Sequence, residues 1–596
     1  MDAAEIDDKR SRYAAAILSA LNIGLGVYVV LFVFRIVYAR LTFPGILQHQ
    51  ESTTIYLVYR MAESLGNLYQ MPALDSESVI YNPAYYFYLW ALHPLIGFQA
   101  APIRIVSVVP FLLLCAVLIE IIGRKYMQVR RLGWTWAFVS LAIYPLFTWI
   151  DLARLEAMLL LSIVLLWYTL CLDDDWRPKY ILVGLAVVFS FAIKQPGALF
   201  AAAPLALALT DRRYLISVAV AVGGIAAFAA GMVAWFGAPY IYWAFTLPAS
   251  HPFRFMDASI HLRDLVGTTP VILFGPLLWL VRGIDFQSAR GKLFAVGAIT
   301  YVVSTLGAGK LGGWYTQYVI LVFLSVIPAA DLIRRGLRTQ DRSSMRFCAV
   351  AFLVIGYSIV TIEACGDRRR VRPRQIDRDQ HAALLEVVRS VPGETWVTTW
   401  SHIDLWAGHG VNAAIYFLDK HPSAIAETEH AIRTRRFSLI LTSPERPMRF
   451  DAQIQANYLH CGSLPMRDFG ARMFWPTEVW ARSPEEREAV LRAFLSFDQK
   501  VATIASASTR FPRNSCKVMR IDAVMERTTV FDLSPTEKLQ LVEDLWDDLS
   551  AQPDQVPMHD RQRQELARRK ANLKNNPTSV ATWEEIQDRI RGRYGA

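Results

Sequence analysis

Long apolar runs in the first 365 residues constrain the fold of this chain more than any other feature of its sequence. A run of about 20 apolar residues is long enough to cross the hydrocarbon of a bilayer as a helix. Windows of this kind lie near 13–38, 103–123, 132–150, 157–172, 179–194, 197–210, 214–236, 265–281, 293–309, 315–333 and 347–364. The first is too long to be a removed signal peptide and lacks a small-residue cleavage site. The sequence therefore predicts a membrane all-α fold with about 11 transmembrane helices.

Composition separates this membrane region from the material that follows it. Apolar residues make up 54% of the chain and charged residues only 19%, whereas soluble domains carry about 25% charged residues. We predict a membrane domain, a soluble α/β domain, a helix with a linker, and a short helical module. Their expected ranges are 1–365, 366–481, 482–529 and 530–596. The six cysteines lack CxxC spacing, which excludes a zinc ribbon or a disulfide scaffold.

The distribution of Lys and Arg predicts which side of the membrane each loop faces. A cytoplasmic N-terminus puts the basic loops at 124–131, 282–292 and 334–346 inside, as the positive-inside rule requires. The segment 85–97 is short and rich in Tyr and Trp, so we expect a re-entrant or surface helix in the first external loop. Residues from about 366 onwards are then outside the cytoplasmic membrane. Because loop charges account for the basic balance, we predict no direct contact with nucleic acid.

Ionisable and aromatic side chains gather at the predicted outer interface, where such groups are functional candidates. They are Glu51 and Tyr81 in the first external loop, Arg154 and Glu156 in ARLEAM, Lys194 in KQPG, and Lys310 with Tyr315 in GKLGGWYTQY. Each has a plainer interpretation. The first acid could be a solvated loop residue, the second acid and its neighbouring arginine a local ion pair, and the lysines could extend to lipid headgroups. Lysines are scarce on this side, which favours an anionic ligand such as a phosphate.

The order of these motifs resembles the C-type membrane glycosyltransferases, the superfamily of the protein mannosyltransferases and aminoarabinose transferases. The resemblance covers residues 10–365 and depends on YNPAYYFYLWALHPLIG, GRKYMQVRR, ARLEAM and KQPG. It implies transfer of a sugar from a polyprenyl-phosphate donor in the bilayer to an acceptor glycan, lipid or protein at the outer face. Members more often have Asp where this chain has Glu51, commonly followed by a second acid, which is Ser52 here.

The same resemblance implies roles for the remaining candidates. Glu51 is the implied general base, and Glu156, which replaces the usual Asp of its motif, is the second catalytic candidate. The implied substrate-binding residues are Arg154, Tyr81, Lys194, Lys310 and Tyr315, of which the last three would bind the carrier phosphate. A carboxylate can take the proton of the attacking acceptor, and cations can stabilise the leaving phosphate. The superfamily leaves a divalent metal open as a cofactor.

The region 366–481 alternates between helical and strand patterns. HAALLEVVRSV and ETEHAIRTRR favour helices, and ETWVTTW and FSLILTS favour strands. Such alternation is typical of a small α/β domain with a parallel sheet. It contains no GxGxxG or GKS/T loop, so we predict no nucleotide site. By the resemblance, this domain is an extracytoplasmic appendage that shapes access for the acceptor.

The last part of the chain predicts an amphipathic helical module. Ser534 is a helix cap, followed by Pro535 and by Glu537 in a capping box. An apolar stripe follows, formed by Leu539, Val542, Leu545, Trp546 and Leu549. The last 65 or so residues resemble the addiction-module antitoxin component family, through LSPTEKLQLVEDLWDDL and TWEEIQDRIRGR. That resemblance implies a cytoplasmic toxin as the partner of the stripe, which conflicts with an external tail unless two genes are joined or translation restarts at Met519 or Met525.

Three functions therefore compete. The first is a lipid-linked sugar transferase with an antitoxin-like tail, and the second is an antitoxin whose tail is the functional part. The third is a polytopic transporter or flippase. A transporter would usually show internal repeats and broken helices, and the sequence shows neither a convincing repeat nor paired Gly/Pro interruptions.

Overall fold

The computed structural model describes most of the membrane region and of the domain that follows it. The described residues are 34–128, 150–268, 270–273, 285–310, 315–336, 375–409, 421–443, 448–464 and 476–494, with single positions at 13, 16, 17, 20, 24, 27, 31, 356, 373, 412, 568 and 571. The chain divides into two compact units, Met1–Ser508 and Thr509–Ala596. Most of the windows at 132–150 and 347–364, and the whole apolar stripe of the tail, lie outside the described residues.

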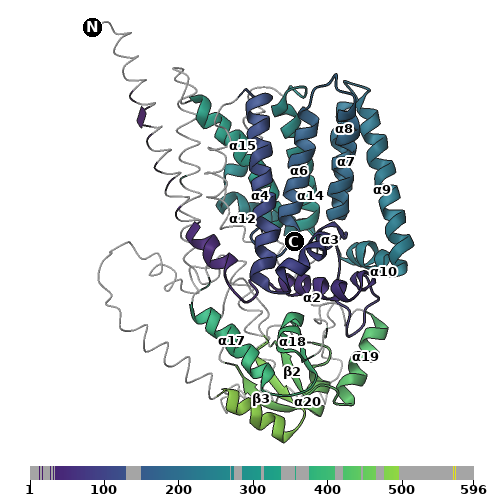
Figure 1. The fold of residues 1–596 in the computed structure, drawn as a ribbon, viewed down its shortest axis with the longest axis vertical. Coiled ribbons are helices and arrows are strands. Elements are labelled where there is room, and N and C mark those ends of the chain that lie inside the picture. Colours follow the sequence, from purple (N-terminus) through teal and green to yellow (C-terminus); the bar gives the residue numbers. More distant parts are fainter. Residues whose placement is uncertain are drawn as a thin grey trace. The chain divides into compact units, whose positions relative to one another are not determined.

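Six apolar helices stand side by side in the first unit (Figure 1). They are α4 (Ala100–Lys125), α6 (Glu156–Cys171), α7 (Pro178–Ile193), α9 (Tyr214–Phe236), α14 (Ala289–Ala308) and α15 (Val319–Gly336). Each coincides with a predicted window within a few residues, which confirms a helical membrane fold for this region. Among the described residues, α4, α9 and α14 are long and apolar enough to cross a membrane. The count of 11 spans stays a prediction.

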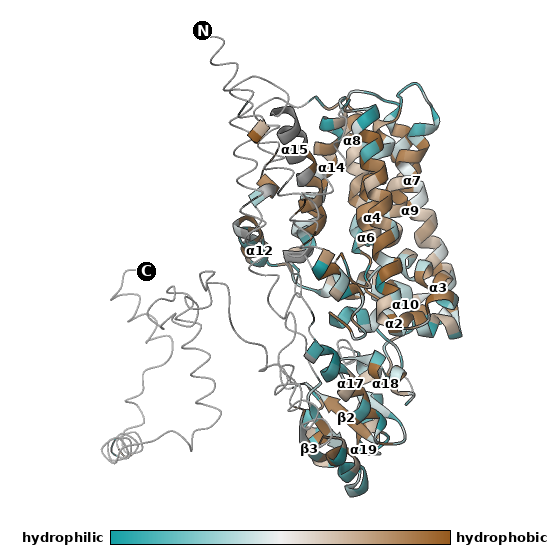
Figure 2. Cartoon of the chain, turned by 60° about the vertical axis from the view of Figure 1, so that its left-hand side comes forward, coloured by the Kyte–Doolittle hydropathy of each residue, from teal (hydrophilic) through white to brown (hydrophobic). Residues whose placement is uncertain are grey.

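The helices α4 and α9 expose apolar side chains, as a lipid-facing surface requires. Figure 2 shows hydrophobic residues along α4 and α9, with hydrophilic residues in loops at the ends of the helices. Leu113 of α4 is 63% exposed, and Val222 of α9 is 59% exposed. Soluble proteins rarely expose contiguous apolar surface of this kind. The surface therefore supports placement in a bilayer.

Shorter helices connect these segments. They are α2 (His49–Glu63), η1 (Leu65–Leu68), α3 (Ala84–Ile96), η3 (Gln195–Ala201), α8 (Ala202–Leu207), α10 (Ala238–Ile241), η4 (Tyr242–Thr246), α11 (Leu247–Ser250), α12 (Phe255–Thr268), η5 (Pro270–Leu273) and η6 (Tyr315–Tyr318). The expected helix at 85–97 is present as α3, and its position in the membrane stays a prediction. The window at 197–210 begins with the 3-10 turn η3, where a Cβ on Gly197 would lie 2.3 Å from the Ser190 carbonyl oxygen of α7. Only glycine allows this close approach.

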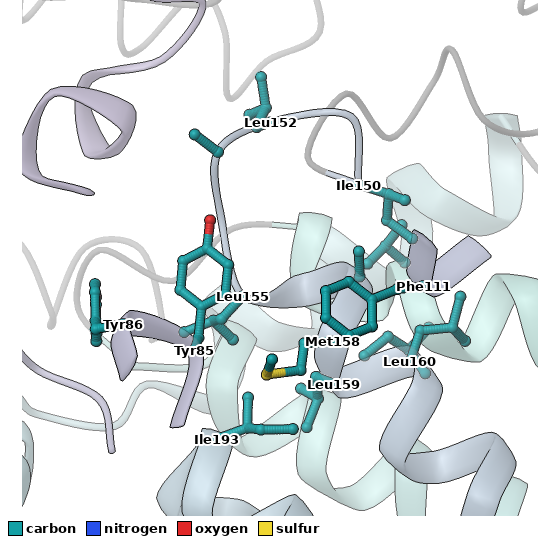
Figure 3. Packing of buried hydrophobic residues seen from close by; sticks show 14 of the residues in the cluster. Tyr85, Tyr86, Phe111, Ile150, Leu152, Leu155, Met158, Leu159, Leu160 and Ile193 are labelled. Carbon is teal, nitrogen blue, oxygen red and sulfur yellow. The ribbon is translucent and has the colours of Figure 1, made fainter. Parts of the chain in front are cut away.

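Large side chains from α3, α4, α6 and α7 pack together in the core (Figure 3). Tyr85 and Tyr86 of α3 are buried, and so are Phe111 of α4, Met158 of α6 and Ile193 of α7. Polar tips in this core have partners. The Tyr85 hydroxyl lies 2.9 Å from Ser107 Oγ. The first loop is thus packed against the membrane helices by its own aromatic residues.

In its described residues, the domain after the membrane helices contains a four-stranded sheet and several helices. The strands are β1 (Thr395–Val397), β2 (Leu439–Thr442), β3 (Leu459–Ser463) and β4 (Glu478–Ala481), in the order β1-β2-β4-β3. The helices include α17 (Gln375–Arg389), α18 (Ser401–Ala407), α19 (Pro422–Arg433) and α20 (Asp451–Asn457), and residues 484–494 are also helical. The β1–β2 pair is parallel, but β4 pairs antiparallel with both β2 and β3. The prediction of a parallel sheet is therefore wrong for half of the strands, because β3 and β4 form a hairpin that needs no crossover helix.

Candidate active site

Glu51 lies in the first turn of α2 and is fully buried. Its Oε1 accepts hydrogen bonds from Arg104 Nε at 2.7 Å and from the Ala153 N–H at 2.8 Å. Its Oε2 accepts from Arg104 Nη2 at 2.8 Å and from the Leu47 N–H at 2.6 Å. Burial raises the pKa of Glu51, but the Arg104 guanidinium and the two backbone N–H groups outweigh burial and hold the pKa below its ordinary value. These four donors fill the four acceptor positions of the carboxylate.

Arg154 and Glu156 form a second buried pair at the start of α6. Arg154 Nη2 donates to Glu156 Oε1 at 2.9 Å, and Nε donates to Oε2 at 3.1 Å. The Arg154 Nη1 also donates to the Gln48 side-chain oxygen at 3.1 Å, and Gln48 caps α2. Glu156 occupies the first helical turn, where the helix dipole favours an acid. Within the described residues, two acceptor positions of Glu156 are filled and two are open.

A third buried pair joins Arg40 to Asp151, with two hydrogen bonds between them. Asp151 is fully buried, and burial raises its pKa despite the opposing effect of Arg40. Sequence reasoning missed Arg40 and Arg104 as partners of the acids. A signal was available for Arg104, because an arginine inside an apolar window is expensive and needs a partner.

Lys194 follows the last residue of α7 and points into the same region. Its Nζ donates to the Gln317 side-chain oxygen at 3.0 Å and lies 5.2 Å from the centre of the Tyr81 ring. Glu156, Lys194 and Gln317 line a narrow cavity of about 40 Å³, together with residues of α6, η3, α14, η6 and α15. A cavity of this size has room for a few water molecules. Three distant parts of the sequence thus bring an acid, a cation and an amide to one cavity whose lining is otherwise mostly apolar.

Side-chain amides fix Tyr81 above Lys194. Gln195 Nε2 donates to the Ile80 carbonyl at 3.2 Å and to the Ala244 carbonyl at 2.8 Å. On the other side, Asn82 Nδ2 donates to the Phe191 carbonyl at 2.6 Å. These three hydrogen bonds hold the first loop against η3, η4 and α7, so the aromatic ring is positioned against a cation. Such a contact contributes about 0.5–2 kcal/mol.

The other candidates are less close to this cavity. Lys310 Nζ donates to the Pro248 carbonyl at 2.6 Å, and Lys310 is not among the residues that line the cavity. Tyr315 begins η6, but its side chain lies outside the description. The structure therefore brings together Tyr81, Arg154, Glu156 and Lys194, and it holds Lys310 against a different segment.

The described residues do not fit a divalent metal. Among them, no group of three or more His, Cys, Asp or Glu side chains could hold an ion. Of the buried acids at this end of the helices, Glu51, Asp151 and Glu156 each bind an arginine, and Glu77 accepts from Ser401 and Ser78. An arginine occupies the positions that a cation would need. No step of the chemistry is therefore assigned to a metal.

The solved structures that resemble this chain include ArnT and an oligosaccharyltransferase. The ArnT protein of Cupriavidus metallidurans, in a structure bound to undecaprenyl phosphate, is 11% identical with a TM-score of 0.51, over 78% of this chain and 99% of that one. The oligosaccharyltransferase AglB of Archaeoglobus fulgidus is also 11% identical, with a TM-score of 0.45 over 80% of this chain and 78% of that one. The similarity to ArnT confirms the fold expected from the motif order. No curated protein sequence matches the chain significantly.

The tail matches a family of its own. The family model described as "Putative addiction module component" matches residues 532–586. This match confirms the resemblance found at the end of the sequence, and it includes the stripe from Leu539 to Leu549. The stripe lies outside the described residues, so its proposed role as a partner surface stays a prediction.

Proposed function

We propose that the membrane region transfers a sugar from a polyprenyl-phosphate carrier to an acceptor at the outer face of the cytoplasmic membrane. The observation that carries this proposal is the cavity where Glu156 of α6 meets Lys194 at the end of α7. An acid beside a cation is what the reaction needs, because a proton leaves the acceptor as negative charge develops on the departing phosphate. The fold shared with ArnT, whose structure holds undecaprenyl phosphate, supports the same reaction class. No observation favours the transporter alternative.

Glu156 is the general base in this proposal. A base needs a free lone pair directed at the proton that it removes. The four acceptor positions of Glu51 are occupied, and that carboxylate is not among the cavity residues. Glu156 lines the cavity and keeps two positions open within the described residues. These contacts favour Glu156 over Glu51, the residue that the motif order implies.

Glu51 is then a positioning residue. It binds the backbone N–H of Ala153 directly before Arg154, and Arg154 holds both oxygens of Glu156. The chain of contacts from Arg104 through Glu51 and Ala153 therefore fixes the start of α6. A base held in one orientation needs little reorganisation during the reaction.

Lys194 is the phosphate-binding cation. Its Nζ has three donors; within the described part of the chain one binds Gln317, which leaves others for phosphate oxygens. Lys310 donates to the Pro248 carbonyl, so we do not assign it a contact with the carrier phosphate. The external position of the first loop and of the α/β domain remains part of the proposal, and it follows from the basic loops on the other side.

Lys194→Gln tests the phosphate site. Retention of undecaprenyl phosphate by the purified full chain, measured by native mass spectrometry, should weaken about tenfold or more, because a charge-assisted bond is lost. Lys125→Gln is the matched control, because Lys125 is exposed at the far end of α4 and should leave retention unchanged. Equal retention in wild type and Lys194→Gln would contradict the phosphate role.

A second function is proposed for the tail alone. The match to an addiction module component at residues 532–586 favours an antitoxin. Its apolar stripe, centred on Trp546, would bind the groove of a cytoplasmic toxin. An antibody against the last residues would distinguish an independently translated tail from a fused chain. A small species on a blot would indicate independent translation. Detection of the full-length species alone would indicate a fused chain.

A further inference from the structure

A histidine of the α/β domain contacts the residue next to Glu51. His402 of α18 is fully buried, and its Nδ1 lies 2.9 Å from Ser52 Oγ. The backbone N–H of His402 also donates to that oxygen at 3.2 Å. Ser401 strengthens the contact, because its hydroxyl donates to Glu77 of the first loop at 2.9 Å. The start of α18 therefore docks on α2 through short polar side chains.

A second buried histidine lies in the same contact. The His381 ring of α17 stacks on the His402 ring, with centroids 6.2 Å apart and planes 8° from parallel. Trp406 presents its ring edge-on to His402 at 4.5 Å and to His381 at 5.6 Å. On the membrane side, a Cβ on Gly45 would lie 2.5 Å from His381 Cδ2, so only glycine lets the ring approach the chain. The pair is enclosed by residues from both regions.

The contact accommodates neutral rings only. Within the described residues, neither His381 Nε2 nor His402 Nε2 has a hydrogen-bond partner, so a proton added there would be buried without an acceptor. The Arg104 guanidinium acts on both rings and opposes a further positive charge. Burial, with Arg104, lowers the pKa of His381 to about 4. Burial, with His381 and Arg104, lowers the pKa of His402 well below its ordinary value.

Three nearby carboxylates, from α2, the first loop and α18, bind other groups. On α2, Glu51 binds Arg104, and in the first loop Glu77 accepts from Ser401 and from Ser78. On α18, Asp404 accepts from Thr395 Oγ1 at 2.6 Å and from the Val397 N–H at 3.0 Å. The charged residues of α17 nearest His381 in sequence are Asp377, Arg378 and Asp379, and Arg378 donates to the Thr42 carbonyl.

We propose that the His381–His402 pair is an acid-sensitive lock that docks the α/β domain on α2 only while both rings are neutral. A released imidazole has an ordinary pKa near 6.5, so the undocked state binds protons more readily than the docked one. The free energy of docking is therefore most favourable above about pH 6.5 and becomes less favourable as the pH falls toward 4. Release breaks the hydrogen bonds between His402 and Ser52, the residue of α2 that directly follows Glu51. The docking step itself does not depend on the proposed transfer reaction.

Distance measurements on the full-length protein test the lock. Spin labels at Leu95 of α3, which is 84% exposed, and at Arg433 of α19, which is 57% exposed, would report the separation of the two regions in a cysteine-free background. A single distance is expected at pH 7.5. A second, broad population should grow between pH 6.5 and 4.5, with uptake of about two protons.

Two substitutions separate the lock from general acid unfolding. His402→Asn keeps an amide that can hydrogen-bond Ser52 from the Nδ1 position, and His381→Phe keeps the stacked ring, but neither can take up a proton. The double variant should stay docked at pH 4.5, and His381→Phe alone should reduce the uptake to about one proton. His430→Asn, at an exposed histidine of α19, should release as wild type does. A wild-type distance that is constant to pH 4.5, or an identical transition in the double variant, would overturn the proposal.

Discussion

Buried carboxylates are handled differently in the membrane region and in the α/β domain. Glu51 is fully buried against the Arg104 guanidinium, and its pKa is below the ordinary value although burial alone would raise it. Asp404 of α18 is equally buried, but its described donors are the neutral Thr395 hydroxyl and the Val397 N–H. Burial raises the pKa of Asp404 to about 8. The same burial therefore leaves one acid charged and the other neutral near pH 7.

The difference shows what each region requires of its acids. The membrane region pairs its buried acids with arginines. The Glu51–Arg104 pair joins α2 to α4 across 53 residues, and the Arg154–Glu156 pair holds Glu156 at the cavity. The α/β domain uses its acid as a local link between β1 and α18. Removing the charge of a buried acid should therefore lower the free energy of unfolding in the membrane region. In the α/β domain it should leave that free energy unchanged or raise it.

Glu51→Gln should produce the largest effect. It leaves Arg104 buried with no compensating charge, and breaking a buried pair in this way costs about 3–5 kcal/mol. The free energy of unfolding in detergent micelles measures the loss. Glu120→Gln is the matched control, because its partner Arg124 is 67% exposed and such a pair contributes at most about 1 kcal/mol. Equal losses of unfolding free energy in Glu51→Gln and Glu120→Gln would contradict the claim that the buried pair contributes more than the exposed one.

Asp404→Asn should produce a smaller effect of opposite sign. Since the folded pKa of about 8 exceeds the unfolded value, wild-type stability is fully present below about pH 4 and is lost as the pH rises toward 8, by at most ~1.4 kcal/mol per pH unit. An amide does not titrate, so the variant should lack this slope and gain on the order of 1 kcal/mol at pH 7. Urea unfolding of the full chain, followed by tryptophan fluorescence at pH 5, 7 and 8, measures both curves. Parallel curves would mean that Asp404 stays ionised in the folded domain.

Periodicity and motif order predicted much of the fold, but less of the site. The predicted windows at 103–123 and 214–236 coincide with α4 and α9. A run of apolar residues is sufficient to predict a membrane helix, because its length matches the bilayer. The motif ARLEAM also led to Glu156. The partners did not follow, since Arg104 is 53 residues from Glu51 and no local pattern encodes that pairing. His402 was missed for the same reason, because its partner Ser52 is 350 positions away.

The central claim is that the cavity lined by Glu156 and Lys194 is where the sugar is transferred. Single-turnover transfer by the purified full chain, with a panel of polyprenyl-phosphate sugars, tests it most directly. Glu156→Gln should reduce the rate about a hundredfold or more, the usual contribution of a general base, while undecaprenyl phosphate is retained as in wild type. The transfer rate of Glu51→Gln, divided by the amount of folded protein, should fall much less than that of Glu156→Gln. Near-normal transfer by Glu156→Gln would contradict the account, and a hundredfold loss confined to Glu51→Gln would return the base to that residue.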